Sequence, residues 1–531
     1  MNNNNSKTQY GMGFLEKKLE FFSKNSMVSI FIMMAISFIV RLYYLPSNTP
    51  LTLDALLYFW YAIDTGILGH FPTSYAIENN GWPAFLSLFF SIFYFDNFID
   101  YMLLQRLTSM SISVLTIIPV YLLCNRFFDK PYALLGAAIF AFEPRIIQNS
   151  LLGIADPLYL LLISTALFLF QSSNKKVMYA SFGTTSLAAL VRYEGMFLFL
   201  ALSIIFFMRY KKEHQVIAKY TLAAAIFVLT LLPMAITRVE ITGQDSLSSN
   251  IQSAPTEIIS LSENAGLIPF LMTGLVNLVK FLGWAMIPVF IFFAPIGFLL
   301  ILKNRNSNTV PIIIIIVAML MPALYAFTVR AFDTRYLFSI YPILCVLSIF
   351  TVKSFTNRYR NRNTALILLI GAILLSSSLF LDLKKVDIEH EKEALSLAYQ
   401  VVNRTKVINQ YPPESKYIII TAMTDLQEFP ILRSDFKGEP IVTLDLKANS
   451  VEEYIQLGRK LGLTHLVVDE IENLRRSAFF KDVYSHEGNY PYLIKKFDSL
   501  EYGYKYHLKI YKIDYDKFDS TVNKSITKDR G

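Results

Sequence analysis

The chain has 531 residues, of which 54% are hydrophobic and only 17% are charged, with a formal net charge of +8. A soluble globular domain is nearer to roughly 45–50% apolar and about 25% charged. This composition therefore excludes a disordered, collagen-like or coiled-coil chain and indicates a membrane protein. The two cysteines, Cys124 and Cys345, lie in apolar runs and exclude a disulfide framework.

Long uncharged runs predict the transmembrane helices, because about 20 residues are needed to cross a hydrocarbon core about 30 Å thick. We predict about 11 spans, at residues 27–45, 102–123, 131–143, 157–171, 177–191, 195–208, 217–236, 284–302, 309–329, 335–352 and 364–381. The apolar stretch 270–302 is interrupted by Lys280, Pro288 and Pro295. We interpret it as one span preceded by a helix in the membrane interface.

Lysine and arginine gather in alternate loops, and this bias predicts the orientation of the chain. Residues 42–105 contain no lysine or arginine, whereas the N-terminal segment before the first span carries several. We therefore predict a cytoplasmic, partly disordered N-terminus over residues 1–26. The long loop over residues 46–101 then faces outward.

After residue 382 the sequence becomes charged and mixes helical with strand-like patterns. The predicted helices cover residues 391–408 and 451–461, and the predicted strands cover residues 417–421, 440–444, 465–469 and 506–513. We therefore predict an extracytoplasmic α/β domain over residues 383–531, after a transmembrane domain over residues 27–382.

Acidic residues lie near the outer ends of two predicted spans, in consecutive outer loops. Asp54 follows the first span, in a loop without a compensating lysine or arginine, and Asp156 precedes Pro157 at the start of the fourth span. Glu143 lies in the same loop as Asp156. Aspartate is also a common helix N-cap residue, and proline is favoured in the first turn. The two interpretations, helix cap and chemical site, both stay open.

Arginines at the outer ends of spans run against the positive-inside bias. The segment RYEG contains Arg192 and Glu194, and the segment VRAFDTRYLFSIYP contains Arg330, Asp333 and Arg335. The planar guanidinium binds phosphate well. The alternative is an ion pair within each segment, Arg192 with Glu194 and Arg335 with Asp333.

Other chemical motifs are missing from the sequence. It contains no GxxxxGK[ST] phosphate loop, no HExxH and no CxxC, and its six histidines are scattered. The basic residues follow the predicted cytoplasmic rim, so a nucleic acid is not an expected partner.

This pattern resembles the GT-C superfamily of membrane glycosyltransferases, which use sugars linked to a lipid phosphate. The superfamily includes protein O-mannosyltransferases, aminoarabinose transferases and the catalytic subunit of oligosaccharyltransferase. The resemblance rests on Asp54 soon after the first span, the long first outer loop, and the element Pro144-x8-Gly153-x-x-Asp156. The segments RYEG and RYLFSIYP complete it, and it covers residues 27 to about 352.

The resemblance implies that Asp54 is the catalytic acid or base and that Asp156 is a second carboxylate near the acceptor. It implies that Arg330 and Arg335 bind the phosphate of the donor. If a divalent cation such as Mg²⁺ or Mn²⁺ takes part, Asp54 and Asp156 would bind it. Candidates for the wall of the site or for acceptor binding are Glu143, Arg192, Glu194 and Asp333.

We therefore predict a multi-pass cell-membrane protein with a mostly α, GT-C-like fold and a C-terminal α/β domain. It would transfer a sugar from a polyprenyl-phosphate donor to a protein, lipid or glycan at the outer face. The main alternative is a polytopic transporter or lipid flippase, which often carries charges near mid-membrane and paired halves. Here the charges gather at the outer ends of spans and no repeat is evident. A membrane-anchored sensor or scaffold is a third class.

Overall fold

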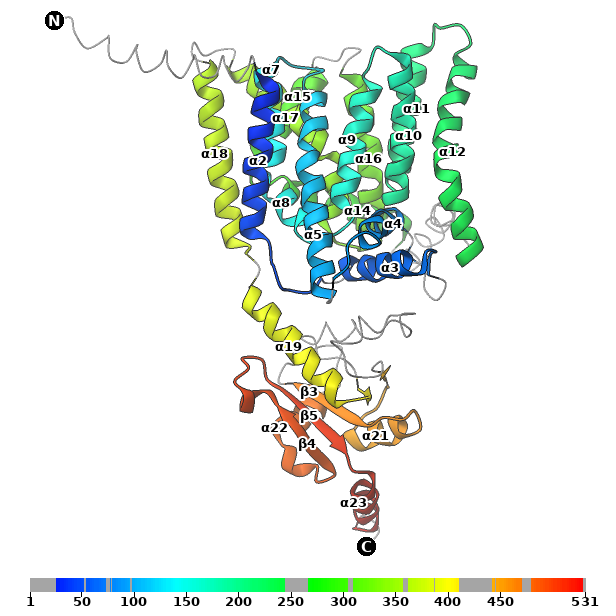
Figure 1. Cartoon of the computed structure of the whole chain (residues 1–531), viewed down its shortest axis with the longest axis vertical. Coiled ribbons are helices and arrows are strands. Elements are labelled where there is room, and N and C mark those ends of the chain that lie inside the picture. The colour runs from blue at the N-terminus through cyan, green and yellow to red at the C-terminus, as the bar shows by residue number, and fades with distance from the viewer. Residues whose placement is uncertain are drawn as a thin grey trace, which may run out of the picture. The chain divides into compact units, whose positions relative to one another are not determined.

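A computed structural model describes residues 25–51, 54–72, 77, 79–95, 98–243, 266–303, 309–356, 362–385, 387–409, 442–444, 446–469 and 479–528. The chain divides into a helical unit, drawn from residues 1–45, 68–89 and 104–385, and a second unit, drawn from residues 46–67, 90–103 and 386–531. Figure 1 shows the elements of both units.

The helical unit consists of α-helices, and a helix coincides with most of each predicted span except 284–302, which is divided between the end of α14, η1 and α15. Its helices are α2 (Ser26–Tyr44), α4 (Gly81–Phe90), α5 (Phe98–Leu115), α6 (Ile117–Cys124), α7 (Lys130–Ala141), α8 (Pro144–Ser150), α9 (Asp156–Phe170), α10 (Lys175–Val191), α11 (Gly195–Tyr210), α12 (Val216–Thr242), α14 (Leu267–Ala285), α15 (Ala294–Lys303), α16 (Val310–Thr328), α17 (Tyr341–Thr356) and α18 (Arg362–Leu383). The 3-10 helices η1 (Phe290–Phe292) and η2 (Thr334–Ile340) precede α15 and α17. The first residues of α5 belong to the second unit.

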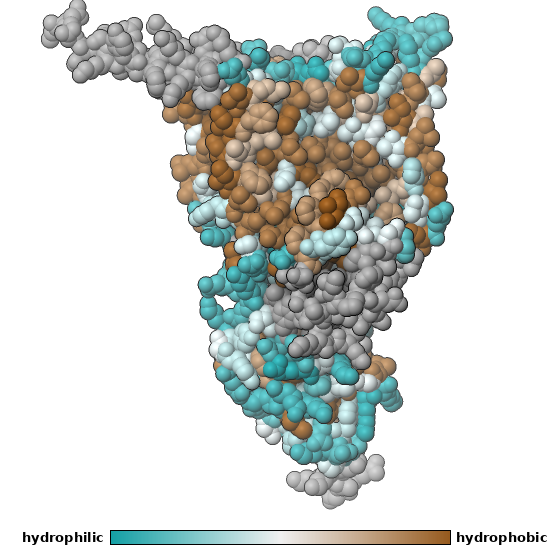
Figure 2. Space-filling view, viewed as in Figure 1, coloured by the Kyte–Doolittle hydropathy of each residue, from teal (hydrophilic) through white to brown (hydrophobic). Residues whose placement is uncertain are grey.

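The helical unit has the length and surface of a membrane domain. Among the described residues, 7 helical stretches are long and apolar enough to cross a membrane, and several shorter helices are also apolar. In the most apolar 18-residue stretch of each of the helices α2, α12 and α18, at most 22% of the residues are buried. Their outward side chains contribute to the broad apolar surface in Figure 2, which suits contact with lipid. The chain is a multi-pass membrane protein, while the number 11 stays a prediction.

The stretch 270–302 forms two helices, α14 and α15, rather than one continuous rod. α14 packs against the C-terminal end of α16, where a Cβ on Gly274 would come within 2.0 Å of the Thr328 hydroxyl oxygen. α15 packs against α17 just as closely, since a Cβ on Gly297 would lie 2.0 Å from the carbonyl oxygen of Leu347. Glycine thus permits both close approaches. α14 alone is also long and apolar enough to span.

A buried arginine ties the first helix to the rest of the helical unit. The Arg41 side chain near the end of α2 is fully buried. Its Nε donates to the Ser150 hydroxyl and its Nη2 to the Ser113 hydroxyl, each at 3.1 Å. Its Nη1 donates to the carbonyl oxygens of Ala141 at 3.1 Å and Ser37 at 3.2 Å. Because a charge in an apolar interior is costly, these acceptors hold α2 against α5, α7 and α8.

The second unit contains a five-stranded sheet and several helices. Its helices are α3 (Asp54–Leu68), α19 (Ile388–Arg404), α21 (Val451–Arg459), α22 (Phe479–Ser485) and α23 (Tyr515–Lys528). Its strands are β1 (Val407–Ile408), β2 (Val442–Thr443), β3 (His465–Asp469), β4 (Leu493–Asp498) and β5 (Leu508–Ile513), in the order β2-β1-β3-β5-β4. β1 pairs in parallel with β2 and β3, and β5 pairs in antiparallel with β3 and β4. The side chains of Val451, Tyr454 and Ile455 on α21 pack into the hydrophobic core of this sheet.

The C-terminal α/β region is therefore confirmed, with changes in detail. The predicted strand 465–469 is β3, the predicted strand 506–513 is shortened to β5, and the described part of 440–444 contains β2. β4 was not predicted, and the last residues of the predicted helix 391–408 form β1. The predicted strand 417–421 lies outside the described residues. The domain boundary at residue 382 stays a prediction.

Candidate active site

The turn between α10 and α11 sets the position of two charged side chains. α10 ends at Val191 and α11 begins at Gly195, so the RYEG segment forms a tight connection. A Cβ on Gly195 would lie 2.5 Å from the backbone nitrogen of Ala189 and 2.7 Å from its Cα. Only glycine allows the two helices to approach this closely. Arg192 and Glu194 are thereby held beside each other at the start of α11.

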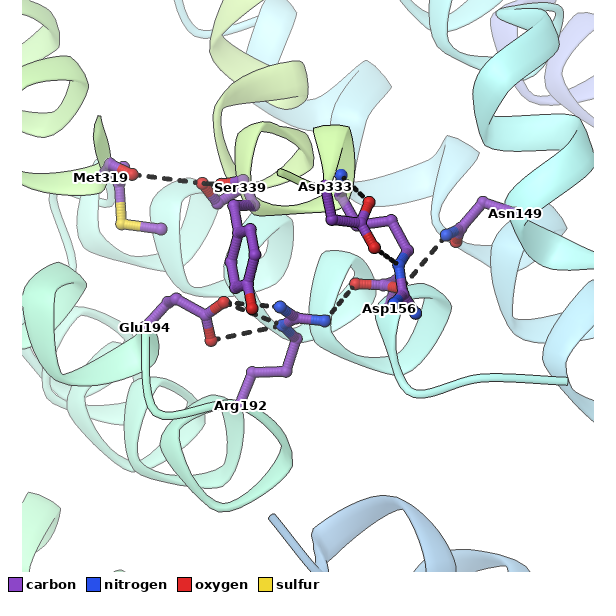
Figure 3. Close-up of polar contacts among 9 residues, drawn as sticks. Asn149, Asp156, Arg192, Glu194, Met319, Asp333 and Ser339 are labelled. Atoms are coloured by element: carbon purple, nitrogen blue, oxygen red, sulfur yellow. Dashed lines mark hydrogen bonds and ion pairs between the residues drawn. The ribbon is translucent and has the colours of Figure 1, made fainter. Parts of the chain in front are cut away.

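The guanidinium of Arg192 joins two buried carboxylates, as Figure 3 shows. Its Nη1 lies 2.7 Å from Oδ1 of Asp156, and its Nη2 lies 2.6 Å from Oε1 of Glu194. Its Nε donates to both Glu194 oxygens, at 3.1 and 3.2 Å. The side chains of Asp156 and Glu194 are each 2% exposed, whereas that of Arg192 is 15% exposed. We call these three residues the arginine clamp.

Asp156 begins α9 without capping it. Ala155 occupies the N-cap position of α9, and Asp156 and Pro157 lie in the first turn of the helix. Oδ2 of Asp156 instead accepts a hydrogen bond of 3.1 Å from Nδ2 of Asn149, while its Oδ1 faces Arg192. The positive end of the α9 dipole also favours a negative charge there. The helix-cap interpretation of the Asp156 side chain is therefore wrong.

The loop before Asp156 is fixed by two donors from other helices. Gly153 adopts the left-handed conformation, with φ 76°. Its carbonyl oxygen accepts hydrogen bonds from Nε1 of Trp82 at 3.1 Å and from Nε2 of Gln105 at 2.7 Å. Trp82 lies on α4 and Gln105 on α5. These two residues therefore hold the peptide that leads into the clamp.

Three tyrosines surround the clamp, and sequence reasoning singled out none of them. The ring centroid of Tyr336 lies 5.8 Å from Cζ of Arg192. The Tyr159 side chain is buried close to the clamp charges, and among the described residues its hydroxyl has no hydrogen-bond partner. Burial, followed by the Glu194 carboxylate, raises the pKa of Tyr193 above its ordinary value. The only sequence signal was the presence of Tyr193 in RYEG and of Tyr336 in RYLFSIYP.

The segment before η2 forms the second predicted ion pair. Oδ1 of Asp333 accepts a hydrogen bond of 2.8 Å from the backbone nitrogen of Arg335, and Oδ2 lies 2.6 Å from Nε of the same residue. Asp333 thus caps η2 and orients the Arg335 side chain. The alternative interpretation, an ion pair within each segment, is confirmed for both Arg192–Glu194 and Arg335–Asp333.

Arg330 occupies a position where glycine is usual. Its φ is 65°, and its side chain is exposed. The backbone nitrogen of Ala331 bonds the carbonyl oxygen of Ala326 at 2.8 Å, which is the pattern of a Schellman motif at the end of α16. A non-glycine residue in this conformation costs about 1–2 kcal/mol. Backbone strain of this kind is often kept for function.

The remaining predicted residues do not join the clamp. Glu143 is fully buried between α7 and α8, near Tyr341, and it forms no described hydrogen bond or ion pair with the clamp. Asp54 is the first residue of α3 in the second unit, and its side chain is exposed. Across the described residues, no group of three or more His, Cys, Asp or Glu side chains converges as a metal site.

Comparison with solved structures shows which fold the chain has. No family model and no curated protein sequence matches the chain. Its structure is similar to the Archaeoglobus fulgidus oligosaccharyltransferase, solved in complex with Zn and sulfate, at 14% identity and a TM-score of 0.55, over 83% of this chain and 68% of that one. The protein has the GT-C fold.

Two further GT-C structures are similar over most of the chain. AglB from Archaeoglobus fulgidus, in complex with an inhibitory peptide and a dolichol-phosphate, is 13% identical with a TM-score of 0.54, over 89% of this chain and 73% of that one. ArnT from Cupriavidus metallidurans, bound to undecaprenyl phosphate, is 10% identical with a TM-score of 0.52, over 91% of this chain and 97% of that one. The resemblance that the sequence predicts is confirmed at the level of fold.

Proposed function

We propose that the protein is a membrane glycosyltransferase that takes a sugar from a polyprenyl-phosphate donor at the outer membrane face. The observation that carries this proposal is the GT-C fold, shared over nearly the whole length of an ArnT that binds undecaprenyl phosphate. The arginine clamp, Arg330 and the Asp333–Arg335 pair add the charged groups that such chemistry needs. The acceptor would be a protein, lipid or glycan.

The proposed reaction is a direct displacement at the anomeric carbon. The acceptor oxygen or nitrogen forms a bond to this carbon as the bond from the carbon to the phosphate oxygen breaks. The electron pair leaves with the polyprenyl phosphate, and the acceptor proton passes to Asp54 as general base. Arg330 and Arg335 would stabilise the negative charge of the departing phosphate.

Asp54 suits the role of base for a physical reason. It is exposed at the start of α3, so an acceptor in the aqueous phase can reach it without crossing apolar side chains. Asp156 is buried, and both of its carboxylate oxygens accept hydrogen bonds from other side chains. We therefore assign proton transfer to Asp54 and a positioning role to Asp156.

The test is the envelope glycan and glycoprotein profile of a deletion strain of the source organism. The strain is complemented with the wild type, Asp54→Asn or Asp129→Asn at equal membrane abundance. Asp129 is the matched control, because it is an exposed aspartate before α7 whose side chain forms no capping bond. We expect the deletion to lose one sugar modification and to accumulate its polyprenyl-phosphate sugar, and only the wild type and Asp129→Asn to restore it.

Two results would contradict the proposal. Full restoration by Asp54→Asn would show that this carboxylate is not the base. A deletion strain that accumulates the donor on the cytoplasmic side, but whose opened membranes still transfer the sugar, would instead indicate a flippase.

A further inference from the structure

The arginine clamp contains two buried carboxylates and a single cation between them. Two carboxylates that face one site cannot both stay ionised without a compensating positive charge. In proteins a divalent metal often supplies this charge, and a zinc ion appears in the solved complex of the similar Archaeoglobus oligosaccharyltransferase. Here all three guanidinium nitrogens of Arg192 are directed at Asp156 and Glu194.

The oxygens of the clamp do not fit a metal ion while Arg192 is in place. Asp156 uses Oδ1 for Arg192 and Oδ2 for Asn149, and both oxygens of Glu194 accept from Arg192. A shared Mg²⁺ would need its ligand oxygens within about 2.1 Å of one point. The guanidinium fills that space, so a cation could enter only if Arg192 left.

We propose that Arg192 takes the place of a divalent cation in this site, so that Asp156 and Glu194 bind no metal and the protein works without one. The proposal rests on the proposed glycosyl transfer only for its activity readout. Arg192 is a positioning residue, which fixes the direction of the Asp156 carboxylate at the start of α9. The planar guanidinium of arginine compensates the charge of two carboxylates and also orients them, whereas the ammonium of lysine compensates the charge without orienting them.

The first experiment measures metal binding directly and needs no substrate. The purified full-length chain in nanodiscs is stripped with EDTA, and Mn²⁺ is added while the free ion is followed by electron paramagnetic resonance. We expect no Mn²⁺ binding by the wild type that depends on Asp156. Arg192→Ala should acquire stoichiometric Mn²⁺ binding, because its two carboxylates and added waters form a site of the kind that Mg²⁺ and Mn²⁺ use. The double variant Arg192→Ala/Asp156→Asn should lose it again.

Two matched variants separate charge from the mere loss of an arginine. Arg335→Ala removes a guanidinium that pairs with Asp333, outside the arginine clamp, so it should acquire no Mn²⁺. Arg192→Lys keeps a positive charge between Asp156 and Glu194 and should also bind none. Thermal unfolding of each variant establishes that it is folded.

The second experiment uses transfer activity in washed membranes from the complemented strain. Wild-type transfer should be unchanged by EDTA, whereas transfer by Arg192→Ala should fall about 100-fold, as expected when loss of a positioning residue displaces the site by about 1 Å. Part of that loss should return with added Mn²⁺.

Three results would overturn the proposal. They are Mn²⁺ binding by the wild type that Asp156→Asn abolishes, loss of wild-type transfer in EDTA with recovery on Mn²⁺, and a folded Arg192→Ala that acquires no Mn²⁺. Failure of the proposed function would look different. It would leave the Mn²⁺ results intact and show no sugar transfer by any form of the chain.

Discussion

Replacing Gly195 by alanine tests whether the tight RYEG turn holds the arginine clamp. The added Cβ would lie 2.5 Å from the backbone nitrogen of Ala189, about 0.9 Å short of the 3.4 Å at which ordinary contact begins. The obstacle is helix backbone, which cannot rotate away as a side chain can. α11 must therefore move relative to α10 by a large part of an ångström.

The clamp lies within one turn of this contact. A displacement of about 0.9 Å along the bond directions would stretch the clamp contacts of 2.6 and 2.7 Å to about 3.5 Å, beyond useful hydrogen-bond length. We expect the free energy of unfolding to fall by about 1–3 kcal/mol through overpacking. We expect sugar transfer to fall by about 100-fold, because a 1 Å error in position has that effect.

The assay combines thermal unfolding of the purified protein with sugar transfer in the complemented strain. The matched control is Gly283→Ala on α14, where an added Cβ meets no atom within 4 Å. In a helix interior this control should keep or slightly increase stability, by up to about 1 kcal/mol. The reasoning would be refuted if Gly195→Ala unfolded and transferred sugar like Gly283→Ala.

Three further predictions concern single positions. Arg330→Gly should raise the free energy of unfolding by about 1 kcal/mol, because glycine adopts the left-handed conformation without strain. The same variant should lower sugar transfer. Equal transfer by the variant and the wild type would show that Arg330 does not stabilise the departing phosphate. Trp82→Phe and Gln105→Leu each remove one donor to the Gly153 carbonyl, so each should lower the free energy of unfolding by about 1 kcal/mol. Both should also lower transfer, although the described hydrogen bonds of Asp156 go to Asn149 and Arg192. Burial, followed by Lys512 and Lys496, lowers the pKa of His465 from 6.5 to about 4. The contribution of neutral His465 to the free energy of unfolding is therefore complete above pH 6.5 and is lost as the pH falls toward 4. Histidine NMR, with the signal assigned through His465→Gln, checks this pKa. A titration of that signal near pH 6.5 would contradict the prediction.

The helical unit was predictable because its signal is simple. A long apolar run indicates a helix regardless of its neighbours, and even the short third and fifth predicted spans coincide with helices, α7 and α10. That these two helices cross the membrane stays a prediction. β4 was missed because Lys495 and Lys496 stand in its middle, where alternation of apolar and polar residues is lost. Local pattern cannot reveal a strand that is defined by its partner β5.

The candidate site was only partly predictable, for a related reason. Charged residues at the mouths of spans stand out from an apolar background, so Asp156, Arg192 and Glu194 could be found, and short spacing suggested the Arg192–Glu194 pair. The bond from Arg192 to Asp156 joins residues 36 positions apart and needs the packing of α9 against α10. Tyr159 was hidden within an apolar helix, where a hydroxyl gives no sequence signal.

The buried Arg41 also constrains how the chain enters the membrane during synthesis. Its acceptors on Ser113, Ala141 and Ser150 are made after α2, so the ribosome releases the first helix before any of them exists. Until α5, α7 and α8 arrive, the guanidinium must reach the lipid headgroups, which its place near the end of α2 allows. A nascent chain arrested before residue 113 therefore has none of the acceptors that α5, α7 and α8 supply, and within α2 only Ser37 accepts from this cation.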